Sequence, residues 1–208
     1  MFFTDRTQAG SLLAEKLSSY RGKIAIVLGL ARGGVQTARA VADALNLPLD
    51  VLVVKKIGAP GETELAIGAL APDTVSSINW RFAQALSADE EYIQEEIRRK
   101  TSDVRLKTNL YRKGRKPYRF REKTVILVDD GAATGATIEA AIKWLRKKHA
   151  KKIIVALPVA PKELLSKIAP EVDALIVLDT PEEFRAVGQF YEKFEQVGDE
   201  EVIELLKA

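Results

Sequence analysis

Cysteine is absent from this 208-residue chain, and histidine occurs once, at His149. The missing thiols exclude disulfides, cysteine nucleophiles and cysteine zinc sites. A single histidine, at the end of a predicted helix, argues against a Ser-His-Asp triad and a multi-histidine metal centre. Any catalysis therefore has to use carboxylates, cations, hydroxyls and backbone donors.

Long hydrophobic runs are also missing. No apolar run approaches the ~20 residues that cross a bilayer, and the first ten residues lack the charged start and apolar centre of a signal peptide. Hydrophobic residues make up 47% of the chain and charged residues 29%, which is typical of a globular protein. We therefore expect a cytoplasmic protein without a membrane partner.

Charge is unevenly distributed. Residues 98–123 hold twelve Lys or Arg and only two acids, Asp103 and Glu122, which gives this segment a charge of +10. The whole chain carries +3, so the other residues together carry −7. Two interpretations of this segment are possible. It is a solvated helix face whose cations face a ligand or a second subunit, or it is a nucleic-acid-binding surface.

Five continuous apolar, β-branched runs predict buried strands. They lie at residues 24–28, 50–54, 124–128, 152–157 and 172–178. Amphipathic helical patterns separate most of them. This alternation predicts an α/β fold with a doubly wound, five-stranded parallel sheet.

The interval 57–123 is far longer than one crossover needs, which predicts an insertion into a single domain over 1–208. Within it, residues 64–70 and 74–79 are expected to pair as a hairpin, and residues 87–114 to form a long basic helix with Ser87 as its cap. The C-terminal segment 180–208 follows the last strand. Its aromatic residues, from Phe184 to Phe194, have helical spacing, which predicts a helix docked on the core or an aromatic wall for a planar ring.

The stretch TVILVDDGAATGAT, residues 124–137, places two acids and a small-residue loop between a strand and a helix. The first N–H groups of the helix and the hydroxyls of Thr134 and Thr137 suit a phosphate. Asp129 and Asp130 would repel that phosphate, so we expect them one step away. There they would bind hydroxyls of a phosphorylated sugar or order water around Mg²⁺.

This stretch resembles the phosphoribosyl-pyrophosphate (PRPP) motif of the type I phosphoribosyltransferases, which has a hydrophobic strand, two acids and Thr-Gly-x-Thr in this order. The resemblance implies a Rossmann-like core with a lid and a small hood, here 57–123 and 180–208. It also implies a Mg²⁺-dependent transfer of the phosphoribosyl group from PRPP to an acceptor nitrogen, with release of pyrophosphate. A homodimer is expected.

The resemblance assigns the residues of the site. The loop 131–137 encloses the 5′-phosphate, the two aspartates contact the ribose and Mg²⁺ through water, and the segment LARGG, residues 30–34, holds the pyrophosphate. The predicted catalytic residues are Arg32, Lys55, Lys56, Asp129 and Asp130. Lys55 or Lys56 is the second cation for the pyrophosphate, and the other is either a further cation for it or a solvated lysine at the strand end. The predicted PRPP-binding residues are Arg32, Gly33, Gly34, Lys56, Asp129, Asp130, Gly131, Ala132, Ala133, Thr134, Gly135, Ala136 and Thr137.

Several alternatives stay open at this point. Ala133 stands where hypoxanthine-guanine members of the family carry Asp, so this position resembles the adenine and uracil members. Glu62 and Glu64 are either acid/base groups on the lid or surface carboxylates. A PRPP-sensing regulator that binds RNA or DNA through 98–123, and a phosphate-binding protein unrelated to PRPP, compete with the enzyme.

Overall fold

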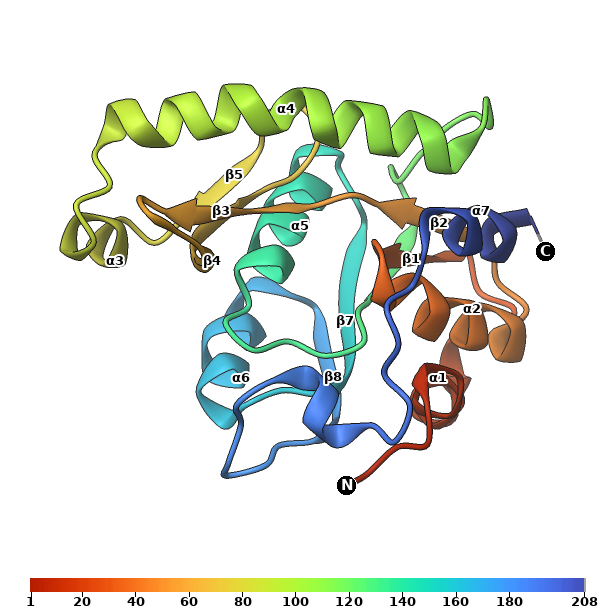
Figure 1. Cartoon of the computed structure of the whole chain (residues 1–208). Helices are drawn as coiled ribbons and strands as arrows, with labels where there is room; N and C mark the ends of the chain where they lie inside the picture. Colours follow the sequence, from red (N-terminus) through yellow and green to blue (C-terminus); the bar gives the residue numbers. More distant parts are fainter. Residues whose placement is uncertain (208) are drawn as a thin grey trace.

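The computed structural model describes residues 1–207, and its central feature is the predicted parallel sheet (Figure 1). All four strand pairs in this sheet are parallel. The strands, in their order across it, are β2 (Leu49–Leu52), β1 (Ala25–Leu30), β6 (Thr124–Val128), β7 (Lys152–Val159) and β8 (Ala174–Asp179). The expected α/β fold with five parallel strands is confirmed.

Helices cover both faces of this sheet. Alternate strand residues face opposite sides: Val27 joins the hydrophobic cluster on the side of the first two helices, and Ile26 joins the cluster on the side of the later two. The helices are α1 (Arg6–Lys16) and α2 (Gly33–Leu45) on one face, and α5 (Ala136–Lys147) and α6 (Lys162–Ile168) on the other. Double coverage explains why the strands read as continuous apolar runs.

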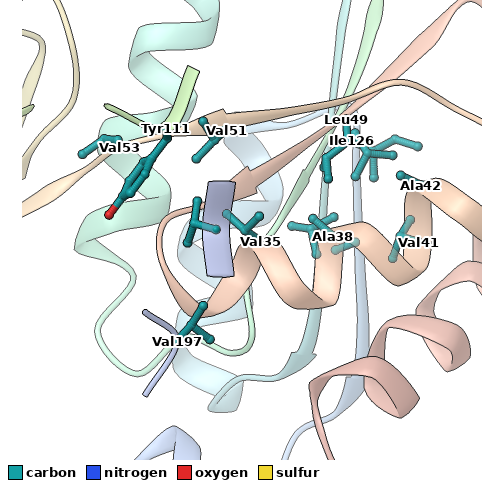
Figure 2. Packing of buried hydrophobic residues seen from close by; sticks show 14 of the residues in the cluster. Val35, Ala38, Val41, Ala42, Leu49, Val51, Val53, Tyr111, Ile126 and Val197 are labelled. Carbon is teal, nitrogen blue, oxygen red and sulfur yellow. The ribbon is translucent and has the colours of Figure 1, made fainter. Parts of the chain in front are cut away.

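The α2 helix shows how the sequence pattern becomes packing. Val35, Ala38, Val41 and Ala42 form its buried stripe, and Figure 2 shows these side chains directed toward the sheet beside Ile126. Asn46 ends the helix in the left-handed region, with φ of 52°, a conformation that asparagine tolerates better than most residues. This packing fixes the start of α2 and hence the loop that precedes it.

The interval between β2 and β6 forms a second, three-stranded antiparallel sheet and two helices. Its elements are β3 (Lys55–Ala59), β4 (Glu62–Leu70), β5 (Ser76–Ile78), α3 (Trp80–Ala85) and α4 (Glu90–Arg112). The expected pairing of 64–70 with 74–79 is confirmed as β4 with β5. β3 and β4 form a hairpin, and the glycine-containing segment 58–61 lies at its turn. Glu62 and Glu64 are exposed beside this turn.

The long helix α4 lies across one end of the molecule (Figure 1). The expected cap at Ser87 is wrong, because Ser87 has φ of 58° and an N-cap needs extended backbone. Asp89 caps the helix instead, its carboxylate accepting the N–H of Tyr92 at 2.8 Å. No helix within residues 1–207 has the length and apolar character needed to cross a membrane.

The tail does not form the helix predicted from its aromatic spacing. Between Phe184 and Phe194 only Val187–Phe190 is helical, as a short 3₁₀ turn, and the helix α7 (Asp199–Lys207) begins later. The tail pairs instead with the N-terminus: Phe3 and Tyr191 form a parallel β-bridge with rings 5.3 Å apart. The aromatic side chains form one cluster with Phe3 and Val159, and this tertiary packing outweighs the helical spacing.

Candidate functional site

The candidate site lies where β1 and β6 end. These strands are neighbours in the sheet. The strand that follows β1 in the chain, β2, lies on one side of this pair, and the strands that follow β6 lie on the other side. This is the point where the strand order reverses, and ligands of open α/β sheets bind beyond the strand ends at such a point. Ala31 and Arg32 form the loop after β1, Gly33 and Gly34 begin α2, and β6 is followed directly by Asp129.

The two glycines that begin α2 touch the two aspartates that follow β6. A Cβ atom on Gly33 would overlap the Asp130 carboxylate, and one on Gly34 would lie 2.6 Å from Asp129 Oδ1. Neither glycine has a positive φ, so close approach, not backbone conformation, requires glycine here. Residues nearly 100 positions apart thus form one surface of backbone and carboxylate.

Asp129 is half-buried and follows β6 directly. Its Oδ1 accepts the N–H of Asp130 at 2.9 Å. Burial raises the pKa of Asp129 well above its usual range, and the neighbouring Asp130 charge raises it further. The charge of Lys56 acts in the opposite direction, which places Lys56 close enough to influence this carboxyl.

Asp130 is held from outside the motif. Arg6, the first residue of α1, donates its Nε–H to Asp130 Oδ2 at 2.7 Å. The hydroxyl of Tyr191, from the tail, donates to the Asp130 backbone carbonyl at 2.6 Å, and burial raises the pKa of Tyr191. The aspartate pair therefore has one carboxyl with a raised pKa and another fixed by an arginine.

The loop 131–135 connects β6 to α5. Gly131 (φ 150°) packs against Val187 of the tail, and Gly135 (φ 76°) takes the N-cap position of α5 against Leu164. Ala133 and Thr134 are exposed at the tip. No side chain among residues 1–207 caps α5, so its first N–H groups, which have no partner within a helix, are open to an anion.

A cavity of about 250 Å³ continues from the first loop. Its cationic lining combines Arg32 and Lys55 with Lys107 of α4. Asp199, the first residue of α7, forms an ion pair with Lys107, accepts the hydroxyl of Tyr111 at 2.7 Å and lies 3.9 Å from Arg32. The Lys107 and Tyr111 contacts lower the pKa of Asp199.

The predicted site residues thus fall into two adjoining groups. Lys56 accompanies the aspartates, whereas Arg32 and Lys55 line the small cavity. Sequence reasoning missed Arg6, Tyr191 and Asp199, which join the site from both ends of the chain and carry no local motif. Lys107 belongs to the basic segment, in which it is one of twelve cations without a distinguishing pattern.

The donor set limits how a metal would bind. No cluster of three or more Asp, Glu or His suited to a metal occurs in the part of the chain that the structure describes. Two neighbouring carboxylates remain at the sheet edge, and Mg²⁺ commonly binds one or two carboxylates while keeping waters and ligand phosphates. The residues fit a Mg²⁺ that arrives with an anionic ligand.

The fold and this site define a class of protein: α/β proteins with a glycine loop, paired acids and a phosphate-type loop at one sheet edge. A family model described as the phosphoribosyl transferase domain matches residues 6–189. The chain therefore belongs to the phosphoribosyltransferase family.

Individual relatives agree with this assignment. Two curated proteins of Mycobacterium tuberculosis, Rv0571c of strain H37Rv and MT0597 of strain CDC 1551, are each named "Putative phosphoribosyl transferase". Each is 39% identical over 204 residues, which are 98% of this chain and 46% of the relative. The chain thus spans about half the length of these curated relatives.

Solved structures support the fold. The crystal structure of TT1426 from Thermus thermophilus is 38% identical, with a TM-score of 0.82 over 99% of this chain and 98% of that one. The structure of AQ2163 from Aquifex aeolicus, at 13% identity and a TM-score of 0.54 over 88% of this chain and 78% of that one, supports the fold alone.

Proposed function

We propose that this protein transfers the 5-phosphoribosyl group of PRPP to an acceptor nitrogen and releases pyrophosphate. The observation that carries the proposal is the contact of Gly33 and Gly34 with the Asp129–Asp130 pair. It joins a loop suited to a diphosphate with acids suited to sugar hydroxyls. The loop 131–137 completes the set with main-chain donors for a 5′-phosphate.

The roles follow from position. The N–H groups of 131–137 and the exposed Thr134 bind the 5′-phosphate, and Asp129 and Asp130 bind the ribose hydroxyls. Arg32 and the backbone of Gly33 and Gly34 bind the diphosphate. Lys56, beside the aspartates, and Lys55, in the small cavity, are the further cations for it.

Mg²⁺ is the proposed cofactor, held by PRPP oxygens and, through water, by Asp129 and Asp130. When bound, it supplies positive charge that neutralises the departing diphosphate. The protein's own contribution is to keep Asp129 available for a ligand. Burial raises the pKa of its carboxyl in the free protein, and a bound cation favours the deprotonated form.

The chemistry is a displacement at the anomeric carbon. The bond from that carbon to the diphosphate oxygen breaks, both its electrons leave with pyrophosphate, and the acceptor nitrogen supplies the pair for the new bond. Arg32, Lys55 and Lys56 stabilise the charge on the leaving group. Water must be excluded from the cationic sugar, and we assign this task to the β3–β4 hairpin.

The domain organisation that we propose is a single phosphoribosyltransferase-like domain over 1–208. In it, 57–123 supplies the lid and 180–208 the hood. The contacts of Tyr191 with Asp130 and of Val187 with Gly131 support the hood assignment. The acceptor is a small molecule with a nucleophilic nitrogen, and a nucleobase is the class that the family resemblance favours. A homodimer stays a prediction.

The test is pyrophosphate release from PRPP and Mg²⁺ with a panel of purine and pyrimidine bases. One acceptor should give release that depends on both PRPP and Mg²⁺, and Asp130→Asn should abolish it. The matched control is Asp103→Asn, which removes an exposed acid of α4 outside the proposed site. Calorimetric titration with PRPP and Mg²⁺ tests the sugar-phosphate site alone, and absence of binding there would overturn the proposal.

A further inference from the structure

A cavity larger than the one beside Arg32 lies away from the sheet edge just described. Its volume is about 900 Å³, and it opens between α4, the segment 115–121, the β4–β5 turn and the C-terminal end of α5. None of the predicted PRPP-binding residues lines it. Trp144, in its wall, lies eight residues beyond the start of α5 at Ala136, about 12 Å along the helix axis.

The cavity is strongly cationic. Its charged lining residues are Asp73, Arg105, Arg112, Lys116, Arg119, Arg121 and Lys148. These give six positive charges against one negative. Cations gathered around a concave, partly apolar surface produce a focused positive potential that attracts anions.

Partners within the protein account for only part of this charge. Lys148 pairs with Asp73 at 2.8 Å, and Arg112 pairs with Asp50 at 3.0 Å. For Arg105, Lys116, Arg119 and Arg121, residues 1–207 provide no ion pair and no side-chain hydrogen bond. Four exposed cations around one cavity are therefore available to bind an external anion.

The wall of the cavity also offers aromatic surface. Phe120 and Trp144 pack edge to face with centroids 5.3 Å apart, and Trp144 Nε1 donates to Asp73 at 2.9 Å. Both rings are almost fully buried, whereas Tyr118 is half-buried and lines the cavity, with Lys123 Nζ 5.4 Å from its ring centroid. Asn109 adds a hydrogen-bonding side chain on α4, whereas the hydroxyls of Thr101 and Thr108 donate to carbonyls of their own helix.

We propose that this cavity is a second ligand site, which binds a nucleotide that carries several phosphates. The phosphates contact Arg105, Lys116, Arg119 and Arg121, and the ring of the base lies against Tyr118. The volume falls within the ~300–1,000 Å³ typical of small-molecule sites. The proposal is independent of the reaction at the sheet edge.

A single nucleotide fits these residues better than a nucleic-acid strand. Proteins that bind single strands stack successive bases on several accessible aromatic rings along a cationic groove. Here only one of the three rings is accessible, because Phe120 and Trp144 are buried. The surface thus provides several phosphate contacts but stacking for only one base.

Calorimetric titration of the full chain tests this site with ATP, GTP, inorganic tripolyphosphate and a thymidine dodecamer as probes. One of the two nucleotides should bind saturably and more tightly than tripolyphosphate. The triple variant Lys116→Gln/Arg119→Gln/Arg121→Gln should weaken that binding by about tenfold or more, since the loss of a single charge-assisted contact lowers affinity by about tenfold or more. Trp80→Phe leaves Trp144 as the only tryptophan, so its fluorescence should change on binding.

The controls separate the two sites. Lys16→Gln/Arg81→Gln removes two exposed cations elsewhere and should bind the nucleotide as the parent does. Asp130→Asn, at the sheet edge, should also retain it. The proposal is overturned if neither nucleotide binds, if tripolyphosphate binds as tightly, if the dodecamer binds more tightly than either nucleotide, or if the Asp130 variant, not the triple variant, loses binding.

Discussion

Arg6 Nε lies 2.7 Å from Asp130 Oδ2, although 124 residues separate the two in sequence. The guanidinium also donates to the Glu195 carbonyl at 2.8 Å and lies 3.8 Å from the centroid of the Phe194 ring. One side chain therefore connects the first helix, the acid pair and the tail. In the proposed enzyme it is a positioning residue for the carboxylate that binds ribose.

Replacing Arg6 should weaken both the fold and the site. The Arg6 side chain is 7% exposed and that of Asp130 is 14% exposed, so Arg6→Ala leaves a nearly buried carboxylate without its partner. We expect a loss of about 3 kcal/mol in unfolding free energy, measured by urea denaturation. Arg6→Lys should recover part of the stability but less of the PRPP affinity, because an ammonium cannot reproduce the fork of donors. Equal recovery of both would contradict a positioning role.

The sequence predicted those features whose cause is local. Continuous apolar runs become strands covered on both faces, and the motif 124–137 folds as one strand, loop and helix start. Arg6, Tyr191 and Asp199 reach the site only through the packing of the chain ends, which no short pattern encodes. The tail was mispredicted for the same reason: pairing of Phe3 with Tyr191 favours an extended segment over a helix.

A methyl group on Gly33 should disrupt the site without straining the backbone. Gly33→Ala places a Cβ where the Asp130 carboxylate lies, so the carboxylate has to move away from the ribose position. Loss of one charge-assisted hydrogen bond corresponds to about a 10- to 100-fold loss of PRPP affinity, measurable by calorimetry. Gly198→Ala is the matched control, since a Cβ there meets nothing within 4 Å. Unchanged affinity in Gly33→Ala would exclude close packing of ribose between these loops.

Lys55 and Lys56 should differ in their effects. Lys56 is exposed near Asp129, whereas Lys55 is half-buried in the cavity with Arg32 and Lys107. We expect Lys56→Met to lower kcat by about 100-fold, the scale of losing one donor to developing negative charge. Lys55→Met should mainly raise KM for PRPP, because two other cations remain in its cavity. Steady-state pyrophosphate release measures both, and identical profiles for the two variants would contradict the division.

Asp129 should make the free protein less stable as pH rises. Burial raises the pKa of its carboxyl in the folded protein above the ordinary value of 3.8. A carboxyl whose pKa is higher in the folded state makes its full contribution to stability below the pKa that it has in the unfolded chain. That contribution is lost as pH rises from the pKa of the unfolded state to the pKa of the folded state. Within this window the loss amounts to about 1.4 kcal/mol per pH unit, and above it the curve is level.

Asp129→Asn removes the ionisable group and with it this slope. Urea unfolding of both ligand-free proteins between about pH 4.5 and 8.5 should show the variant gaining stability over the parent as pH rises, up to the folded pKa. Asp103→Asn, at an exposed position of α4, should leave the parent's profile unchanged. Parallel curves for Asp129→Asn and the parent would mean that the carboxyl ionises in the fold as easily as in the unfolded chain. In that case no proton would have to leave Asp129 when Mg²⁺ and PRPP bind.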